Sequence, residues 1–204
     1  MELVATYKTV KEESEGLYKE KGSKFIGYVV ACYSEGEAKK YIDKWRKDHF
    51  QARHLCYAYR FGLDHKQVRS NDDGEPNNSA GIPILGQIQS FELTNVLIGV
   101  VRYFGGTKLG VGGLVQAYKT AAKEAIESAE IITVEVFDWV EICFEYADMP
   151  HVMNLLKSKE IVQYEQDFGL VCKLTALFPL NLSIILKEEL DKMPTVTYQS
   201  KGIK

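Results

Sequence analysis

The sequence lacks paired cysteines and long apolar runs. Its four cysteines, Cys32, Cys56, Cys143 and Cys172, include no Cys-x-x-Cys pair, and all lie in apolar, strand-like runs. This spacing argues against a zinc site and a disulfide framework, and it is typical of buried, reduced thiols. The longest apolar runs, such as Val96–Val101, are far too short to span a bilayer. We therefore expect a soluble, cytoplasmic protein with no membrane partner.

Proline is also scarce, and there is no excess of basic charge. With five prolines, 16 glycines and 46% hydrophobic residues, the 204-residue chain is globular rather than disordered, and its length lies between one domain and two. The net charge of −3 argues against a simple basic nucleic-acid binder, and we expect no DNA sequence recognition. Residues 1–7 contain no basic stretch leading into an apolar one, so we expect no signal peptide.

Arginine is confined to the first half of the chain. The five arginines are Arg46, Arg53, Arg60, Arg69 and Arg102. Residues 138–204 carry seven lysines against ten acidic groups and no arginine. Because guanidinium groups suit forked phosphate contacts, this asymmetry predicts two parts, with anion recognition in the first.

The first part alternates strand and helix patterns. Strands are predicted over 25–33, 54–61 and 96–103, and helices from a capping box at Ser34 to about residue 49 and from 114 to about 129. The 96–103 strand is continuously apolar, as expected of a central strand buried on both faces. The apolar residues of the second helix lie on one face: Leu114, Ala117, Tyr118, Ala121, Ala122, Ala125 and Ile126.

The second part predicts a compact unit of the order β-α-β-β-α-β. Strands are expected over 139–146, 161–168, 170–178 and 195–199, and helices start near Asp148 and Asn181. This order is that of the split βαβ, ferredoxin-like unit.

Five glycines fall where the central strand ends and the following helix begins. They are Gly105, Gly106, Gly110, Gly112 and Gly113. Glycine permits positive φ and close backbone approach, and the free N–H groups of a helix N-terminus attract anions. Arg102 and Lys108 flank the turn and add positive charge. We interpret the turn as a site for phosphate or carboxylate; the alternative is a tight turn that needs glycine only for packing.

Asp72, Asp73 and Glu75 lie close together in a polar loop. Three such carboxylates would hold a divalent cation such as Mg²⁺ or form salt bridges to the basic groups of the glycine turn. The alternative is a solvated turn that caps the next helix through Asn78 or Ser79. Both interpretations stay open at the level of the sequence.

His54 and Cys56 point to the same side of the 54–61 strand. A Cys-His nucleophile pair needs a third, orienting group, and none is evident, so a buried cysteine beside a hydrogen-bonded histidine is favoured. Tyr57 and Tyr59 on the other face are interpreted as core, with a base-stacking platform as the weaker alternative. The absence of a convincing catalytic set favours binding over catalysis.

Several short motifs occur in one order between about residues 20 and 120. They are GSKFI at 22–26, HLCYAYR at 54–60, DDGEP at 72–76, AGIPIL at 80–85, RYFGG at 102–106, KLG at 108–110 and GGL at 112–114. In these motifs the chain resembles the YigZ/IMPACT family. It departs from the family pattern at Asn78-Ser79, where Gly-Thr is usual, and at Gln116, where many members carry arginine. We expect the first to alter the loop backbone and the second to remove a positive charge near the site.

The resemblance implies an α+β fold of two domains. Residues 1–134 would be like domain 2 of ribosomal protein S5, and residues 135–204 would be ferredoxin-like, similar to domain V of elongation factor G. Eukaryotic relatives regulate translation through protein contacts. The resemblance therefore implies a link to translation, with the ribosome, an RNA or a regulatory protein as candidate partners.

Two hypotheses of function compete. The first is a non-catalytic, translation-associated protein that holds an anion, a nucleotide or an RNA phosphate at the glycine turn. Its binding residues would be the five glycines together with Arg53, His54, Arg60, Arg102 and Lys108. The second is an enzyme acting on a phosphorylated small molecule, in which the three acidic residues of the loop place Mg²⁺ beside the bound phosphate. The second hypothesis predicts a pocket that joins the acidic loop to the glycine turn.

Overall fold

The computed structural model describes residues 5–169 and 171–203, which fall into two compact units. One unit is Lys8–Thr133, and the other takes in the residues from Val134 onward together with the described residues before Lys8. The expected mixed α/β fold with two domains is thereby confirmed. In the described ranges no helix is both long enough and apolar enough to cross a bilayer. A separate two-stranded sheet is formed by β1 (Thr6–Val10) and β7 (Ile131–Glu135).

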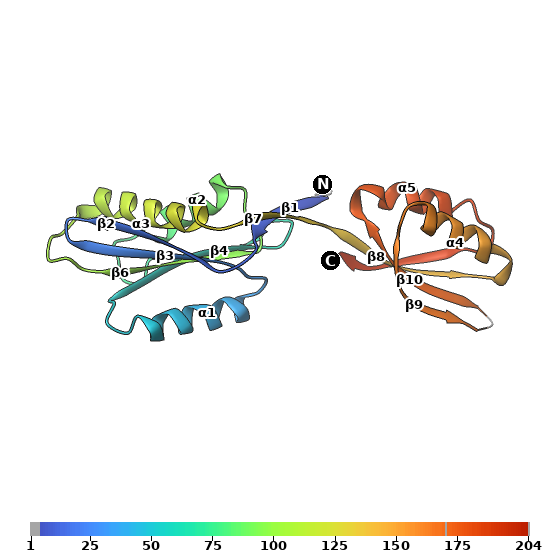
Figure 1. Ribbon diagram of the computed structural model, residues 1–204, viewed down its shortest axis with the longest axis horizontal. Helices are drawn as coiled ribbons and strands as arrows, with labels where there is room; N and C mark the ends of the chain where they lie inside the picture. Colours follow the sequence, from blue (N-terminus) through green and yellow to red (C-terminus); the bar gives the residue numbers. More distant parts are fainter. Residues whose placement is uncertain (1–4, 170, 204) are drawn as a thin grey trace. The chain divides into compact units, whose positions relative to one another are not determined.

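The Lys8–Thr133 unit is built on a five-stranded sheet covered by helices on both faces (Figure 1). The strands are β2 (Ser14–Glu20), β3 (Ser23–Ala31), β4 (His54–Phe61), β5 (Gln67–Asn71) and β6 (Val96–Tyr103), in the order β2-β3-β6-β4-β5. All neighbouring pairs are antiparallel. Helix α1 (Glu35–Asp48) lies on one face, and α2 (Gly81–Ser90) and α3 (Gly110–Glu127) lie on the other (Figure 1).

The central position of β6 follows from its sequence. Every residue of the strand except Tyr103 is buried, as the continuous apolar run predicts. Helix α1 begins as expected, because the Ser34 hydroxyl accepts a hydrogen bond from the Glu37 backbone N–H at 3.3 Å. The Glu37 carboxylate in turn accepts from the backbone N–H of Tyr33 at 2.9 Å, so the return bond goes to the residue before the N-cap and not to Ser34 itself.

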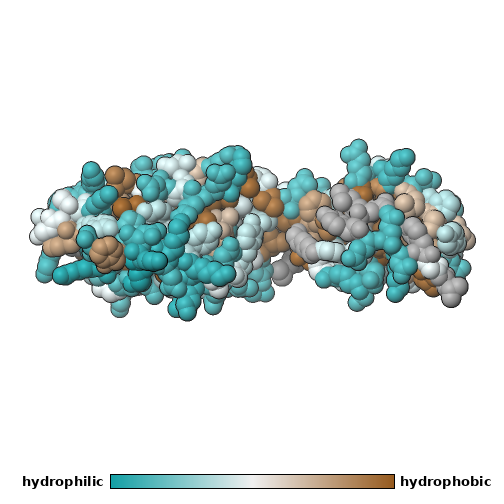
Figure 2. Space-filling model, turned by 60° about the horizontal axis from the view of Figure 1, so that its bottom comes forward, coloured by the Kyte–Doolittle hydropathy of each residue, from teal (hydrophilic) through white to brown (hydrophobic). Residues whose placement is uncertain are grey.

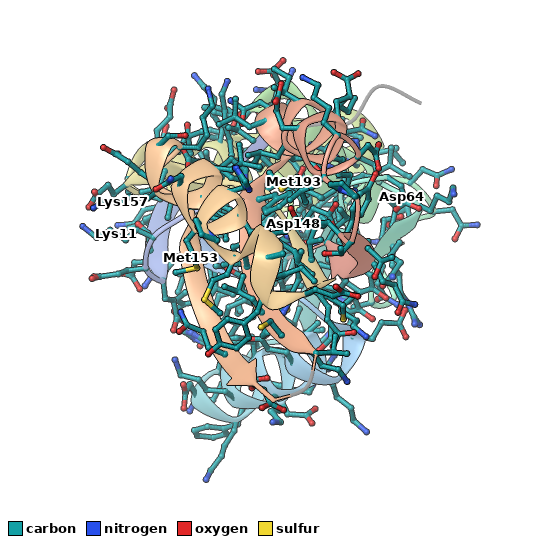
Figure 3. All side chains as sticks on the ribbon, turned by 90° about the vertical axis from the view of Figure 1, so that its right-hand side faces the viewer. Lys11, Asp64, Asp148, Met153, Lys157 and Met193 are labelled. Carbon is teal, nitrogen blue, oxygen red and sulfur yellow. The ribbon has the colours of Figure 1, made fainter. Side chains whose placement is uncertain are left out.

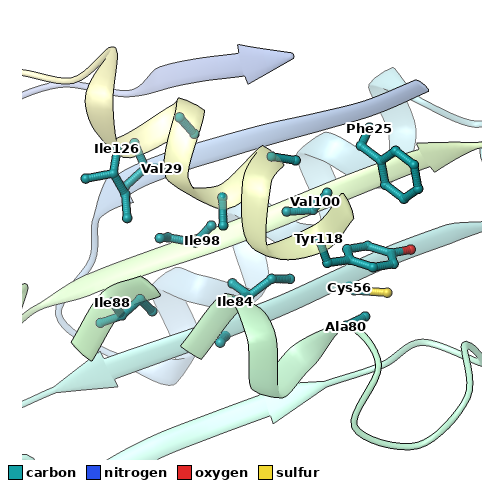
Figure 4. Packing of buried hydrophobic residues seen from close by; sticks show 14 of the residues in the cluster. Phe25, Val29, Cys56, Ala80, Ile84, Ile88, Ile98, Val100, Tyr118 and Ile126 are labelled. Carbon is teal, nitrogen blue, oxygen red and sulfur yellow. The ribbon is translucent and has the colours of Figure 1, made fainter. Parts of the chain in front are cut away.

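The core between the sheet and α2/α3 is shown in Figure 4. The apolar face of α3 is buried in all seven predicted positions. Tyr118 of α3, Phe25 of β3 and Cys56 of β4 lie near one another in this view, and the Tyr118 and Phe25 rings meet edge to face at 5.2 Å. Ile84 and Ile88 fill the core from α2. In the view of Figure 2, hydrophilic side chains cover most of this unit, with small hydrophobic patches between them.

The sequence patterns did not predict the edge strands. β2 and β5 form the two edges of the sheet, and most of their residues are partly or fully exposed, so they carry little apolar periodicity. The strand expected at 25–33 lies two residues earlier, at Ser23–Ala31. The helix expected from residue 114 begins at Gly110, because its first turn includes three of the glycines, Gly110, Gly112 and Gly113.

The second unit has the expected β-α-β-β-α-β order. It consists of β8 (Phe137–Phe144), a short 3₁₀ turn (Tyr146–Asp148), α4 (Met149–Ser158), β9 (Val162–Phe168), β10 (Cys172–Pro179), α5 (Leu180–Leu190) and β11 (Thr197–Ile203). The sheet order is β11-β8-β10-β9 with all pairs antiparallel, which is the ferredoxin-like arrangement. Leu170, expected in the hairpin between β9 and β10, lies outside the described residues.

Both helices of this unit lie on the same face of its sheet (Figure 1). Met153 of α4 and Met193, which follows α5, pack against the core between the helices and the sheet (Figure 3). Asp148 stands at the start of α4 as predicted, but its side chain does not cap the helix. It accepts hydrogen bonds from the backbone N–H and the hydroxyl of Thr195, at 3.1 and 2.8 Å, and so ties α4 to the segment before β11.

Gly27 provides a test of how closely α3 packs on the sheet. A Cβ at this position of β3 would lie 2.3 Å from the Ala121 carbonyl oxygen of α3. We expect Gly27→Ala to lower the free energy of unfolding by about 3 kcal/mol, because the helix must move away from the strand. Gly36→Ala is the matched control: nothing lies within 4 Å of its Cβ, and alanine in α1 should be neutral or slightly stabilising. Equal melting temperatures by calorimetry would contradict the close approach.

Candidate functional site

A cavity of about 460 Å³ opens between the glycine turn and the acidic loop. Three cationic side chains line it: Arg53 before β4, Arg102 near the end of β6, and Lys108 in the turn. His54, Glu75 and Gly110 line it as well. The cavity thus joins the two motifs that the sequence analysis singled out.

A buried ion pair forms the floor of this arrangement. One Arg102 guanidinium nitrogen donates to the Glu75 Oε1 atom at 2.6 Å, and the side chains are only 8% and 4% exposed. The Tyr118 hydroxyl of α3 donates to the same oxygen at 2.8 Å. Burial is the main cause that raises the pKa of Tyr118, with the adjoining Cys56 and Glu75 adding to it, so the phenol stays a donor. The acidic loop was expected either to hold a cation or to form salt bridges with the basic groups of the glycine turn. Glu75 forms such a salt bridge, with Arg102.

Arg102 contacts two aromatic rings. Its guanidinium carbon lies 5.6 Å from the ring centroids of both Phe25 and Phe104. Its Nε atom is buried and has no hydrogen-bond partner. A buried donor without an acceptor costs about 1–3 kcal/mol, so the ion pair with Glu75 leaves the hydrogen-bonding capacity of Arg102 incompletely used.

Asp72 caps helix α2 from eight residues upstream. Its Oδ1 atom accepts from the backbone N–H groups of Ala80 and Gly81 at 3.0 and 2.8 Å, and its Oδ2 accepts from Asn78 at 2.8 Å. The prediction that Asn78 or Ser79 caps this helix is therefore wrong, since neither side chain bonds to its first N–H groups. Asn78 has a φ of +62°, in the left-handed region that glycine adopts freely. Asparagine also adopts this region, so the loop can keep the same backbone conformation where the family pattern has glycine.

Asp73 fastens the loop to the start of β4. Its carboxylate accepts from the Leu55 backbone N–H at 2.8 Å and from Arg46 at 3.2 Å. Its carbonyl oxygen accepts from the Nδ1 atom of His54 at 2.8 Å. Because a carbonyl only accepts, the His54 Nδ1 carries the hydrogen, and Nε2 is the ring nitrogen left for the cavity that the side chain lines.

Cys56 is a buried thiol and not a nucleophile. Its Sγ atom donates to the Asp72 carbonyl oxygen at 3.0 Å. Burial raises the pKa of the Cys56 thiol far above its usual range, so no thiolate forms at neutral pH. The interpretation of this strand face as structural is thereby supported.

The acidic loop offers no cluster for a cation. Within the described residues, no group of three or more His, Cys, Asp or Glu side chains is placed to hold a metal ion. All three carboxylates of the loop are engaged, each with a different part of the unit. The pocket that the enzyme hypothesis requires is present, but free carboxylates for Mg²⁺ are not among its lining residues.

The glycines of the turn serve different purposes. A Cβ at Gly105 would lie 1.9 Å from the Gly22 backbone, so this glycine permits close packing against the β2–β3 turn. Gly106 and Gly110 have φ values of +89° and +72°, which side chains other than glycine rarely adopt. The packing interpretation therefore holds for Gly105, while Gly110 lines the cavity.

The N-terminus of α3 opens into the cavity without a side-chain cap. Its N-cap residue is Leu109, which has no hydrogen-bonding side chain, and its first turn contains no acidic residue. Leu109, Gly110 and Val111 all line the cavity. Gly112 and Gly113 belong to this first turn but are not lining residues. The positive end of the helix dipole is therefore directed at a space bordered by cations.

The structure does not bring Arg60 to this site. In the β4–β6 register His54 pairs with Arg102, whereas Arg60 pairs with Val96, about 20 Å away along the strand. The Arg60 Nε donates to the Leu93 carbonyl oxygen at 2.7 Å, which is a structural contact. Gln116 also lies outside the lining, and its amide donates to Thr120 at 3.1 Å.

Sequence reasoning missed two aromatic members of the site, as well as the apolar residues of the lining. Tyr118 was assigned only to the apolar face of the helix, and its hydroxyl donates to Glu75. Phe104 lies inside the glycine motif, and its ring covers Arg102. A tyrosine among alanines on a buried helix face was the available signal, because a buried phenol needs a hydrogen-bond partner.

The Glu75–Arg102 pair predicts strongly non-additive mutations. Glu75→Gln removes the charge that balances buried Arg102, and we expect the free energy of unfolding to fall by about 3 kcal/mol. Arg102→Met should lower the free energy of unfolding by a similar amount, because it leaves Glu75 without its cation. In the double variant both charges are gone. Its loss of unfolding free energy should therefore be about 2 kcal/mol smaller than the sum of the losses of the two single variants. Additive losses in chemical unfolding experiments would show that the pair is not energetically coupled.

Comparisons with known proteins fit these observations. The Impact N-terminal domain family model matches residues 21–126. The IMPACT family member YvyE of Bacillus subtilis (strain 168) is 32% identical over 163 residues, which cover 80% of this chain and 75% of that protein. An IMPACT family member of Thermus thermophilus is 40% identical over 141 residues, covering 68% of this chain and 74% of its own.

A solved structure extends the likeness to both units. The crystal structure of a hypothetical protein has a TM-score of 0.72 at 24% identity, and the match covers 98% of this chain and 99% of the other. This likeness concerns the fold alone. From the family match and the relatives, the chain belongs to the IMPACT family.

Proposed function

We propose that this chain is a non-catalytic, translation-associated regulatory protein that binds an RNA phosphate in the cavity between the glycine turn and the acidic loop. The observation that carries the proposal is that three cationic side chains, Arg53, Arg102 and Lys108, line one cavity at the uncapped start of α3. Membership of the IMPACT family supports the link to translation, which the resemblance of the motifs implies.

Charge at the rim supports an anionic ligand. Arg53 and Lys108 are exposed, line the cavity and form no ion pair among the described residues. Glu75 is the one carboxylate among the lining residues, and its charge is balanced by Arg102. The uncapped start of α3 adds the N–H groups and the partial positive charge that favour phosphate. A phosphate would therefore meet donors from a strand, a turn and a helix.

Engagement of the carboxylates favours binding over metal-assisted chemistry. Phosphoryl transfer relies on cations held by carboxylates beside the phosphate. Here Asp72 caps α2, Asp73 bonds to the start of β4, and Glu75 pairs with Arg102. The proposal accordingly assigns no catalytic residue to the cavity.

Charge reversal at the rim tests the proposal. We expect Lys108→Glu to weaken binding of a short, fluorescently labelled single-stranded RNA by about 10-fold at low salt, and to reduce the salt dependence of binding by about one phosphate contact. The matched control is Lys119→Glu, which changes charge by the same amount at an exposed position of α3 outside the cavity. Binding can be followed by fluorescence anisotropy over a salt series.

Two outcomes would contradict the proposed function. One is the absence of RNA binding by the unmodified chain at low salt. The other is an equal loss of affinity in Lys108→Glu and Lys119→Glu, which would indicate that only the overall charge matters. Ribosome co-sedimentation with the same pair of variants then tests the translation link separately from RNA binding.

A further inference from the structure

The cavity is lined by apolar as well as cationic groups. Pro76, Phe104, Leu109, Val111 and Leu114 make up its apolar lining. Two of them, Phe104 and Val111, are large hydrophobic residues that are 52% and 56% exposed. Inorganic phosphate would use the cationic side of such a cavity and leave this apolar wall without a function. The lining therefore suits a ligand that has an anionic group and a flat or apolar body.

Phe104 has the geometry of a stacking platform. Arg102 approaches this ring, with its guanidinium carbon 5.6 Å from the centroid. The same guanidinium also contacts the Phe25 ring, at 5.6 Å from its centroid, and forms the ion pair with Glu75. The Phe104 ring is thus supported by a group that is itself held in place, while half of the residue remains exposed. A fixed, exposed aromatic beside a cationic groove is the arrangement on which unpaired bases stack.

The size of the cavity agrees with a nucleotide. At about 460 Å³ it lies within the range of roughly 300–1,000 Å³ that is usual for small-molecule and cofactor sites. The phosphate-binding groups and Phe104 belong to the same segment: Phe104 precedes the turn, and Lys108 and Gly110 follow within it. One ligand that occupies the cavity would therefore meet both.

We propose that the cavity takes an unpaired nucleotide unit, with its phosphate at the start of α3 between Arg102 and Lys108 and its base stacked on Phe104. This inference rests on the proposed anion site and adds the recognition of a base to it. A base within a duplex is covered on both faces by its neighbours, so the unit must be single-stranded or a free nucleotide. Stacking tolerates all four bases, so binding has little sequence preference.

The test compares two strands of the same length and charge, one of ordinary RNA and one of abasic ribose phosphates. The unmodified chain should bind the RNA about 10-fold more tightly than the abasic strand, since stacking of a base on an aromatic side chain is worth roughly that factor. Phe104→Leu should bind both strands equally, at the affinity of the abasic strand. Phe104→Trp should restore the preference for RNA, because it restores the aromatic face.

Two control variants separate stacking from charge and from general aromatic exposure. Phe50→Leu removes another exposed phenylalanine, 79% accessible, that does not line the cavity, and it should leave the preference unchanged. Lys108→Glu should lower the affinity for RNA and for the abasic strand by the same factor. The duplex form of the same RNA should bind no better than the abasic strand.

The outcomes distinguish this inference from the proposed function. If the unmodified chain binds both strands equally while Lys108→Glu still weakens binding, the anion site stands and the base site is wrong. If neither strand binds, or Lys108→Glu has no effect, the proposed function itself is wrong. Competition by adenosine monophosphate, with inorganic phosphate as the control, identifies the source: displacement by the nucleotide supports a free nucleotide, and displacement by oligonucleotide alone supports RNA.

Discussion

The ion pair between Glu75 and Arg102 is the interaction on which the cavity depends. A single carboxylate oxygen of Glu75 accepts from Arg102 on β6 and from Tyr118 on α3, and so joins the acidic loop to a strand and a helix. Because both charged side chains are more than nine-tenths buried, loss of either leaves the other uncompensated in a medium of low dielectric constant. The positions of the loop, of Arg102 and of the start of α3 are therefore fixed together. The surplus positive charge of the cavity then comes from Arg53 and Lys108 at its rim.

The same contacts explain how an acidic loop borders a site for anions. Three free carboxylates in this place would repel a phosphate. Asp72 instead accepts the N–H groups at the start of α2, Asp73 accepts from the start of β4, and Glu75 balances a buried guanidinium. Each carboxylate thereby has a hydrogen-bond donor or a cation of the protein as its partner. The loop therefore connects α2, β4 and β6 through its carboxylates. The cavity is left bordered by the start of α3 and by basic side chains.

Local periodicity was sufficient to predict the central elements of the fold. The buried face of α3 and the limits of β4 and β6 follow from apolar spacing, because these elements lie against the core along their whole length. Edge strands such as β2 and β5 are specified by pairing with a neighbour, and a half-exposed strand carries no comparable pattern. The capping of α2 by Asp72 was missed for a related reason. Helix caps are expected within a few residues of the first turn, and this one comes from a loop that folds back over eight residues.

The candidate site was predictable in its backbone but not in its side-chain partners. The positions of the glycines identified the turn, since positive φ at Gly106 and Gly110 follows from residue type alone. The roles of Arg60 and Arg102 could not be separated by sequence, because both are arginines at strand ends, and only the β4–β6 register places them apart. The two units also differ in charge, because residues 138–204 contain no arginine and carry ten acidic groups against seven lysines. Acidic groups repel a phosphate backbone, which supports placing the proposed anion site in the first unit.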